Sequence, residues 1–134
     1  RPPRSTLSSS SAASDVYKRQ GKIYCIEDYL YSDEFGVAGA VDMIAEWDGK
    51  LSVIDFKTSN SAKKEEWIEN YFIQGTAYAK MFTERTGIEC NQLIIFVVPD
   101  DGIPQTFIKR VDDYTELLRE SIRDYTNHKS KRAA

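Results

Sequence analysis

The sequence predicts an α/β domain of the α+β type, in which strands and helices pack around one core. Three observations predict it: strand-like runs lie between residues 22 and 56, a long helical pattern follows them, and a continuous apolar run, Leu93–Val98, comes after the helix. A continuous apolar run of that length is typical of a strand that is covered on both faces. A chain of 134 residues is long enough to bury a single core.

The first half of the chain is predicted to form a three-stranded meander. Residues Lys22–Tyr31 are β-branched and aromatic with approximate alternation, and Val37–Trp47 and Lys50–Phe56 are two further strand-like runs. Between these two runs, Asp48-Gly49 is the dipeptide expected in a tight hairpin turn whose central residues need positive φ. The second and third strands should therefore pair as a hairpin.

A helical pattern begins near Lys63 and continues to about Arg85, where Thr86-Gly87 provides a C-terminal stop. On a helical wheel, one side of this segment is rich in aromatic residues and should face the sheet. The residues on or next to that side are Trp67, Ile68, Tyr71, Gln74, Gly75, Tyr78, Met81 and Phe82.

The last part of the chain is predicted to add a strand and a helix. Residues Thr106–Lys109 are expected to pair back on Leu93–Val98 as a further strand. A final amphipathic helix is expected from Asp112 to about Asn127. The apolar residues that it carries are Tyr114, Leu117, Leu118, Ile122 and Tyr125.

Both ends of the chain differ from residues 21–128, which we take as the domain. Residues 1–20 have no periodicity and are rich in Ser, Ala and Pro, which is the composition of a disordered tail or of a foreign segment. The string DVYKRQ is what GAT GTG TAT AAG AGA CAG encodes, and it resembles the transposon-end adapter used in building sequencing libraries. We interpret this tail as a translated artefact, with an ordinary flexible N-terminus as the alternative. Residues 129–134 are a basic tail that is expected to fray.

Composition narrows the class of protein. The 18 basic and 21 acidic residues include four basic and one acidic residue in the first 20, so the remainder carries 14 against 20, a net charge of −6. The domain therefore does not attract its ligand by bulk charge.

Cys25 and Cys90 have no C-x-x-C partner, which excludes a zinc ribbon or a four-cysteine iron–sulfur cluster within this chain. No apolar stretch approaches the roughly 18 residues that suggest a membrane span. With no targeting signal visible, we expect a cytoplasmic protein of a bacterial or phage-infected cell.

Two aspartates and a lysine at neighbouring strands form the candidate site. Asp42 lies inside one apolar run, and Asp55 and Lys57 close the next. If the two runs pair, the carboxylates approach each other and need a compensating cation, because like charges held close cannot both stay ionised at low cost. Mg²⁺ typically takes one or two carboxylates from a protein, and the Phe56 carbonyl could be a further ligand. Lys57 shares the strand face of Asp55 and can touch the same phosphate or water, as metal-assisted phosphodiester hydrolysis requires.

The acidic-x-Lys triplet has little meaning alone, since one is expected by chance about once in a chain of this length. A second triplet, Asp48-Gly49-Lys50, lies in the predicted turn and is best explained as solvated turn chemistry. Asp55-Phe56-Lys57 differs through its context. It follows an apolar strand and precedes a helix with a polar pair, four residues apart on one face, consisting of Gln74 and Tyr78.

Gln74 falls among aromatic residues on the face that is expected to be buried. A buried amide without partners costs on the order of 1–3 kcal/mol, so its side chain should be hydrogen-bonded. The alternative is a surface glutamine beside a core tyrosine.

Three motifs together resemble a known family. Gly39–Asp42, Ile54–Ser59 and Gln74–Tyr78 match, in this order, the G-x-x-D, D-x-K and Q-x-x-x-Y pattern of the RecB-like branch of the PD-(D/E)XK nuclease superfamily. The chain is most similar to phage-type exonucleases and the mitochondrial genome maintenance exonuclease, over roughly Tyr24–Val98. The resemblance implies a restriction-endonuclease-like core, with a mixed central sheet flanked by helices. In that family the core opens with a helix, which often bears an acidic or His side chain of the active site. Here residues 1–20 occupy the place of this helix. We therefore expect an N-terminally truncated domain.

The resemblance also implies roles for individual residues. Asp42 and Asp55 would hold Mg²⁺ or Mn²⁺, and Lys57 would act on the attacking water or the scissile phosphate. Gln74 and Tyr78 would shape the site and hold DNA. Lys63 and Lys64 at the helix start are equally well explained as phosphate contacts or as a solvated helix start, and Glu27 could face the site or water.

The expected function is a metal-dependent DNA exonuclease acting on single-stranded or duplex ends, without an iron–sulfur cluster and with a possible helicase or recombination partner. A non-catalytic nucleic-acid-binding or scaffolding module of a helicase–nuclease assembly is the alternative from another class. The charge of −6 and the truncated start favour that alternative a little, and the intact Asp42, Asp55 and Lys57 argue against it. A site-specific endonuclease shares the chemistry, but nothing in the sequence resembles a base-reading element.

Overall fold

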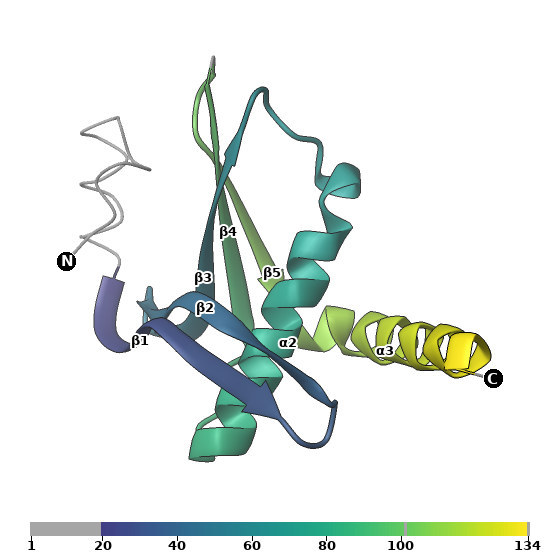
Figure 1. Cartoon of the computed structure of the whole chain (residues 1–134). Helices are drawn as coiled ribbons and strands as arrows, with labels where there is room; N and C mark the ends of the chain where they lie inside the picture. Colours follow the sequence, from purple (N-terminus) through teal and green to yellow (C-terminus); the bar gives the residue numbers. More distant parts are fainter. Residues whose placement is uncertain (1–19, 101, 134) are drawn as a thin grey trace.

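The computed structural model describes residues 20–100 and 102–133. Within them, a five-stranded mixed sheet in the order β1-β2-β3-β4-β5 carries α2 across one face, and α3 packs against α2 and the edge strand β5 (Figure 1). The α+β class and the mixed sheet are as the sequence predicted. The absence of a first core helix was predicted for a segment that lies outside the described residues. The elements are β1 (Gln20–Ser32), β2 (Val37–Trp47), β3 (Lys50–Ser59), the short 3₁₀ turn η1 (Glu65–Trp67), α2 (Glu69–Thr86), β4 (Gln92–Pro99), β5 (Gln105–Arg110) and α3 (Val111–Ala133).

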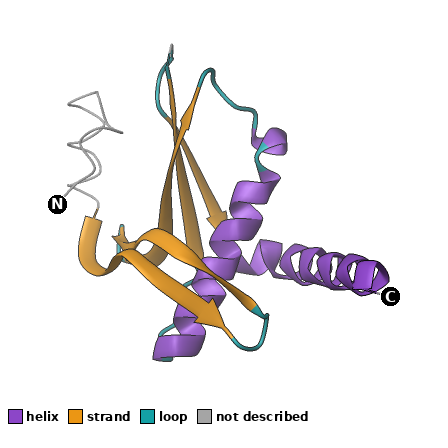
Figure 2. Cartoon of the chain, in the orientation of Figure 1, coloured by secondary structure: helices purple, strands orange, loops and turns teal. Residues whose placement is uncertain are grey.

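The sheet is antiparallel except between β3 and β4, which run parallel. Parallel neighbours need a long crossover, and α2 supplies it (Figure 2). The hairpin between β2 and β3 turns at Asp48 and Gly49, whose φ values are +50° and +78°. Positive φ at both central residues is the geometry that the Asp-Gly dipeptide predicted.

The main core lies between the sheet and the two helices. Phe72 of α2 is 1% exposed and contacts aromatic rings of β5 and α3, and Leu93, Ile95 and Val97 of β4 are fully buried beneath the helices. β4 is therefore buried as its apolar run predicted. A smaller cluster covers the opposite face of the sheet and consists of Met43, Ala45, Trp47, Ile54, Ile94 and Phe96, with Phe56 stacked on Phe96.

The start of the first helix was predicted wrongly. The α-helix begins at Glu69 rather than Lys63, because the preceding segment is tied to β5: the Lys63 N–H donates to Gln105 Oε1 at 2.7 Å, and Gln105 Nε2 donates back to the Lys63 carbonyl at 2.8 Å. Trp67 therefore lies in η1, off the helical wheel, and is 63% exposed instead of facing the sheet. Phe72 takes the central core position.

The last helix is longer than predicted and buries fewer of the expected residues. It runs from Val111 to Ala133 rather than to about Asn127, so the backbone of the basic end that was expected to fray is helical. Leu118 is buried, but Tyr125 is 68% exposed, because α3 projects beyond the sheet after its first turns (Figure 1). Among the described residues, no helix is both long and apolar enough to cross a membrane.

Glu84, near the end of α2, fixes the turn between β1 and β2. Its carboxylate accepts hydrogen bonds from Ser32 Oγ and the Asp33 N–H at 2.8 Å each and from the Glu34 N–H at 3.2 Å, and it also pairs with Arg85. The backbone N–H of Asp33 and the other donors lower the pKa of Glu84 to about 2. The hairpin that carries Gly39 and Asp42 is thus attached to the helix that carries Gln74 and Tyr78.

Candidate active site

Asp42 and Asp55 lie where the hairpin of β2 and β3 opens. Backbone pairing between these strands ends at Met43 and Ile54, so Asp42 and Asp55 would be the next opposed pair. Instead of continuing the ladder, the Phe56 N–H donates to Asp42 Oδ2 at 3.0 Å. The Asp42 carboxylate thus takes the hydrogen bond that the backbone of β2 would otherwise accept. The two carboxyl groups come together at the point where β2 and β3 diverge.

A distortion of β1 and β2 helps to aim Asp42. The register passes from Ile26–Met43 to Asp28–Val41 without the intervening pair of Glu27 and Asp42, and Glu27 has a φ of +52°. A non-glycine residue at positive φ is uncommon in a strand. Val41 packs in the main core and Met43 in the opposite cluster, although residues two apart on a regular strand share a face. The strand therefore changes face at Asp42.

From Asp55 a continuous row of polar contacts crosses to α2. Lys57 Nζ lies 3.0 Å from Asp55 Oδ2 and donates to Gln74 Oε1 at 3.2 Å. Gln74 Nε2 in turn donates to the Tyr78 hydroxyl oxygen at 3.4 Å. The D-x-K and Q-x-x-x-Y motifs are thus joined by direct side-chain contacts.

The row decides between the two interpretations of Gln74. Its side chain is exposed, so the expectation of a buried amide was wrong; the amide is nonetheless bonded on both sides, at Lys57 and at Tyr78. The reason is that α2 turns its buried face through Phe72, Gly75 and Tyr78, which leaves Gln74 at the border of the helix and the site.

Asp55 is the electrostatic centre of the site. Burial first, and a hydrogen bond with Asp42 second, raise its pKa to about 7, although the ammonium of Lys57 acts in the opposite direction. The Asp55 side chain is only 10% exposed. One cation therefore does not fully compensate the carboxyl pair, and the site favours a second positive charge.

Burial also raises the pKa of Tyr78, with the negative charge of Asp55 acting in the same direction. The hydroxyl keeps its proton at neutral pH. Because Gln74 donates to its oxygen, that proton is available to a further acceptor such as a phosphate oxygen.

The donor set is that of a hard cation. Two carboxylates offer oxygen ligands, and the Phe56 N–H points toward Asp42, so its carbonyl points to the same side of the strand and away from the parallel ladder with β4. Oxygen donors of this kind suit Mg²⁺ or Mn²⁺ rather than zinc. Within the described ranges, no group of three or more His, Cys, Asp or Glu side chains could hold a metal, so Glu27 does not complete such a group.

The glycine of the G-x-x-D motif has a direct structural reason. A Cβ on Gly39 would lie 3.1 Å from both the hydroxyl oxygen and Cε1 of Tyr78. Gly39 thus leaves the space in which the tyrosine tip rests against β2. Gly75, next to Gln74, plays a similar part toward Leu93 of β4, which a Cβ there would approach to 3.2 Å.

Replacing Gly39 with Val is expected to displace the Tyr78 hydroxyl and to lower the free energy of unfolding by about 1–3 kcal/mol, because the added methyl groups overpack this contact. Thermal unfolding measures the effect. The matched control is Ala38→Val, one residue earlier, where Ala38 is exposed and the same β-branched side chain should leave the midpoint nearly unchanged. Equal loss in the two variants would contradict the role given to Gly39.

The other predicted residues lie beside this row rather than in it. Lys63 and Lys64 precede η1 instead of starting the helix; the Lys64 ammonium lies 5.1 Å from the Trp67 ring centroid. Glu27 is exposed. The sequence interpretation gave no role to Tyr71, whose ring centroid lies 4.8 Å from Lys57 Nζ. Its position three residues before Gln74 was the available signal.

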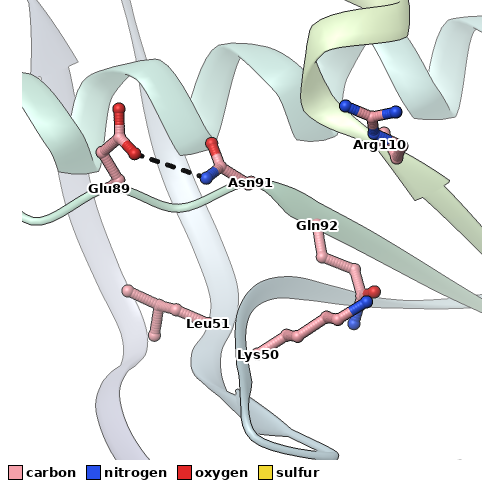
Figure 3. Close-up of a pocket in the computed structure, with 6 residues that line it drawn as sticks. All are labelled: Lys50, Leu51, Glu89, Asn91, Gln92 and Arg110. Carbon is pink, nitrogen blue, oxygen red and sulfur yellow. Dashed lines mark hydrogen bonds between the residues drawn. The ribbon is translucent and has the colours of Figure 1, made fainter.

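A pocket of about 340 Å³ lies at the other end of the sheet, where β3 and β4 begin and β5 ends (Figure 3). Apart from Leu51, its lining side chains are polar or charged, and Arg110 Nη2 lies 3.7 Å from Asp112 Oδ2. Asp55 and Lys57 lie in the second half of β3, away from its start at Lys50, so the pocket is separate from the candidate site. The lining residues are Lys50, Leu51, Glu89, Asn91, Gln92 and Arg110.

Comparison with protein-family models and with curated proteins gives no match for this sequence. The structure, however, is similar to the crystal structure of a proposed exonuclease from Eubacterium rectale, with a TM-score of 0.54 and 16% sequence identity over 78% of this chain. The chain has a nuclease-like fold. It spans 43% of the length of that protein, and at this identity the likeness concerns the fold alone.

Proposed function

We propose that the chain is a metal-dependent DNA exonuclease domain of the RecB-like branch of the PD-(D/E)XK superfamily, of the phage-type and mitochondrial genome maintenance kind. The observation that carries the proposal is the row of contacts from Asp55 through Lys57 and Gln74 to Tyr78, with Asp42 bonded to the Phe56 N–H beside it, so that residues of three separate motifs meet. The nuclease-like fold supports it. Random D-x-K triplets do not have such surroundings, as Asp48-Gly49-Lys50 in the exposed turn illustrates.

Asp42, Asp55 and the Phe56 carbonyl would hold Mg²⁺ or Mn²⁺. Such an ion, when bound, lowers the pKa of a coordinated water and neutralises charge on the phosphoryl oxygens. The raised pKa of Asp55 is compatible with this assignment, because burial and the neighbouring Asp42 disfavour its charged form and a bound cation would favour it.

The protein side chains have complementary parts in this proposal. Lys57 is held between Asp55 and Gln74, with its charge beside the ring of Tyr71, so it can orient the attacking water or stabilise charge on the scissile phosphate. Gln74 fixes Lys57, and Tyr78 offers a hydroxyl proton to a phosphate oxygen. Lys63 and Lys64 would contact the DNA backbone further from the scissile bond.

A non-catalytic nucleic-acid-binding or scaffolding module within a helicase–nuclease assembly is the second candidate. One observation favours it: among the described residues, the site has two carboxylates and no third acidic or His ligand nearby. A scaffold has no use for divalent ions at these carboxylates, so metal binding separates the two candidates.

The test is degradation of end-labelled single-stranded and blunt duplex DNA by the 134-residue chain in Mg²⁺, in Mn²⁺ and in EDTA. We expect stepwise release of nucleotides from linear DNA only with a divalent ion, no cleavage of covalently closed circles, and loss of activity in Asp42→Asn. A Mn²⁺ titration followed by thermal unfolding runs in parallel. Mn²⁺-induced stabilisation without hydrolysis would support a metal-binding remnant, and neither response in the wild-type chain would overturn the nuclease proposal.

A further inference from the structure

Trp67 is a large aromatic side chain on a fixed piece of backbone, yet it is 63% exposed. The segment before it is attached to β5 by the two hydrogen bonds between Lys63 and Gln105. Within η1, Glu65 forms an ion pair with Lys109 of β5 at 2.6 Å, and the following Ile68 is 2% exposed. The backbone is thus held from both sides while the indole itself remains in solvent.

The turn that carries Trp67 leads directly into the candidate site. The Ile68 N–H donates to the Glu65 carbonyl and the Tyr71 N–H donates to the Ile68 carbonyl, so η1 and α2 are continuous. Trp67 lies seven positions before Gln74, and the part of α2 from Glu69 to Gln74 rises by roughly 7.5 Å. Tyr71, between them, carries the Lys57 ammonium against its ring.

The charges around Trp67 favour a ligand that binds by stacking. Lys64 lies over its ring, but Glu66 and Glu69 are also exposed close by in the sequence, and Glu65 is already paired with Lys109. Affinity for duplex DNA comes mainly from many contacts between basic residues and phosphates, and this part of the surface has too few basic residues for that. An exposed indole instead offers a face to any unpaired base, independent of sequence.

We infer that Trp67 is a stacking platform for an unpaired nucleobase of a single-stranded DNA end whose scissile phosphate lies at Asp42, Asp55 and Lys57. This inference rests on the proposed nuclease function and names its substrate class. Lys64 would neutralise the phosphate next to the stacked base. With Lys57, Lys63 and Lys64 as the phosphate contacts, the logarithm of the association constant should fall with the logarithm of salt concentration with a slope of only about −2.

The test is equilibrium binding in EDTA, where hydrolysis cannot occur, of a short fluorescent deoxythymidine oligomer and of an abasic oligomer of the same length. Trp67→Ala is expected to weaken binding of the thymidine oligomer by roughly 5- to 100-fold and binding of the abasic chain by less than about 2-fold, because only the former has bases to stack. Trp67→Phe should retain most of the affinity. Since Trp47 is 3% exposed, quenching of tryptophan emission by the thymidine oligomer should come from Trp67.

Tyr125→Ala is the matched control, because Tyr125 is an aromatic residue of similar exposure on α3. It should bind both oligomers as the wild type does, and thermal unfolding should show that all variants are folded. The stacking role of Trp67 would be contradicted by any of three results: unchanged binding of the thymidine oligomer by Trp67→Ala, equal losses of affinity for both oligomers, or no binding by the wild type. Hydrolysis in Mg²⁺ is measured separately. If Trp67→Ala binds and hydrolyses DNA as the wild type does, the proposed nuclease function stands and the stacking platform does not. If the wild type is inactive but Trp67→Ala selectively loses binding of the thymidine oligomer, the platform stands and the nuclease function does not.

Discussion

Lys57→Ala is expected to reduce metal-dependent DNA hydrolysis by about 100- to 1,000-fold, the usual effect of removing one group that stabilises transition-state charge. The ammonium is held 3.0 Å from Asp55 and 3.2 Å from Gln74, so its position is fixed before substrate arrives. A preorganised charge of this kind needs no rearrangement during the reaction. Initial rates on single-stranded DNA at saturating Mg²⁺ measure the effect.

The second D-x-K triplet of the chain provides the control for Lys57. Lys50→Ala removes a lysine from the same sequence pattern in the exposed turn and should leave the rate unchanged within about 2-fold. Lys57→Ala also removes a positive charge that lowers the pKa of Asp55, so rates should be compared at pH 8.5 as well as pH 7. A defect that disappears at pH 8.5 would mean that Lys57 acts only by keeping Asp55 ionised, and full activity at both pH values would remove it from the site.

Asp55→Asn is expected to stabilise the fold at pH 8 in EDTA while abolishing stabilisation by Mn²⁺. The pKa of Asp55 is about 7 in the folded chain against an ordinary 3.8, because burial and Asp42 disfavour its charged form. The folded state therefore binds more protons than the unfolded state between these values, and stability is lost as pH rises from about 4 to about 7. Asparagine lacks that ionisation, so the gain at pH 8 should be on the order of 1–4 kcal/mol.

Thermal unfolding from pH 4 to pH 8, with and without Mn²⁺, measures both parts of this prediction. In EDTA the wild-type midpoint should fall across that range relative to Asp55→Asn, and at pH 8 Mn²⁺ should raise the midpoint of the wild type alone, since a ligand stabilises the state that binds it. Asp48→Asn is the matched change from carboxylate to amide in the exposed turn. If Asp55→Asn matches Asp48→Asn both in its pH-dependent stability and in its response to Mn²⁺, then Asp55 neither has a raised pKa in the folded chain nor binds the metal.

The sequence alone determined the features that depend on neighbouring residues. The bounds of β2 came out as predicted, because apolar runs and the Asp48-Gly49 turn are local signals. Lys57 follows Asp55 on one strand face, and Tyr78 follows Gln74 on one helix face, so spacing within each motif already grouped these side chains. Gly87, at φ +75°, ends α2 as expected.

Contacts between distant segments decided the rest. The start of α2 depends on Gln105, which is 42 residues from Lys63 and competes for its backbone groups, so helical periodicity extended the predicted helix too far. The same contacts left Trp67 in solvent. Likewise Gly39 meets Tyr78 and Lys57 meets Tyr71 because α2 crosses the sheet. Asp42 bonds to the Phe56 N–H because β2 and β3 diverge at that point. The sequence by itself thus determined which residues are candidates for the chemistry, and only the tertiary structure decided how they touch, because a linear pattern records spacing along the chain and not the path of one segment past another.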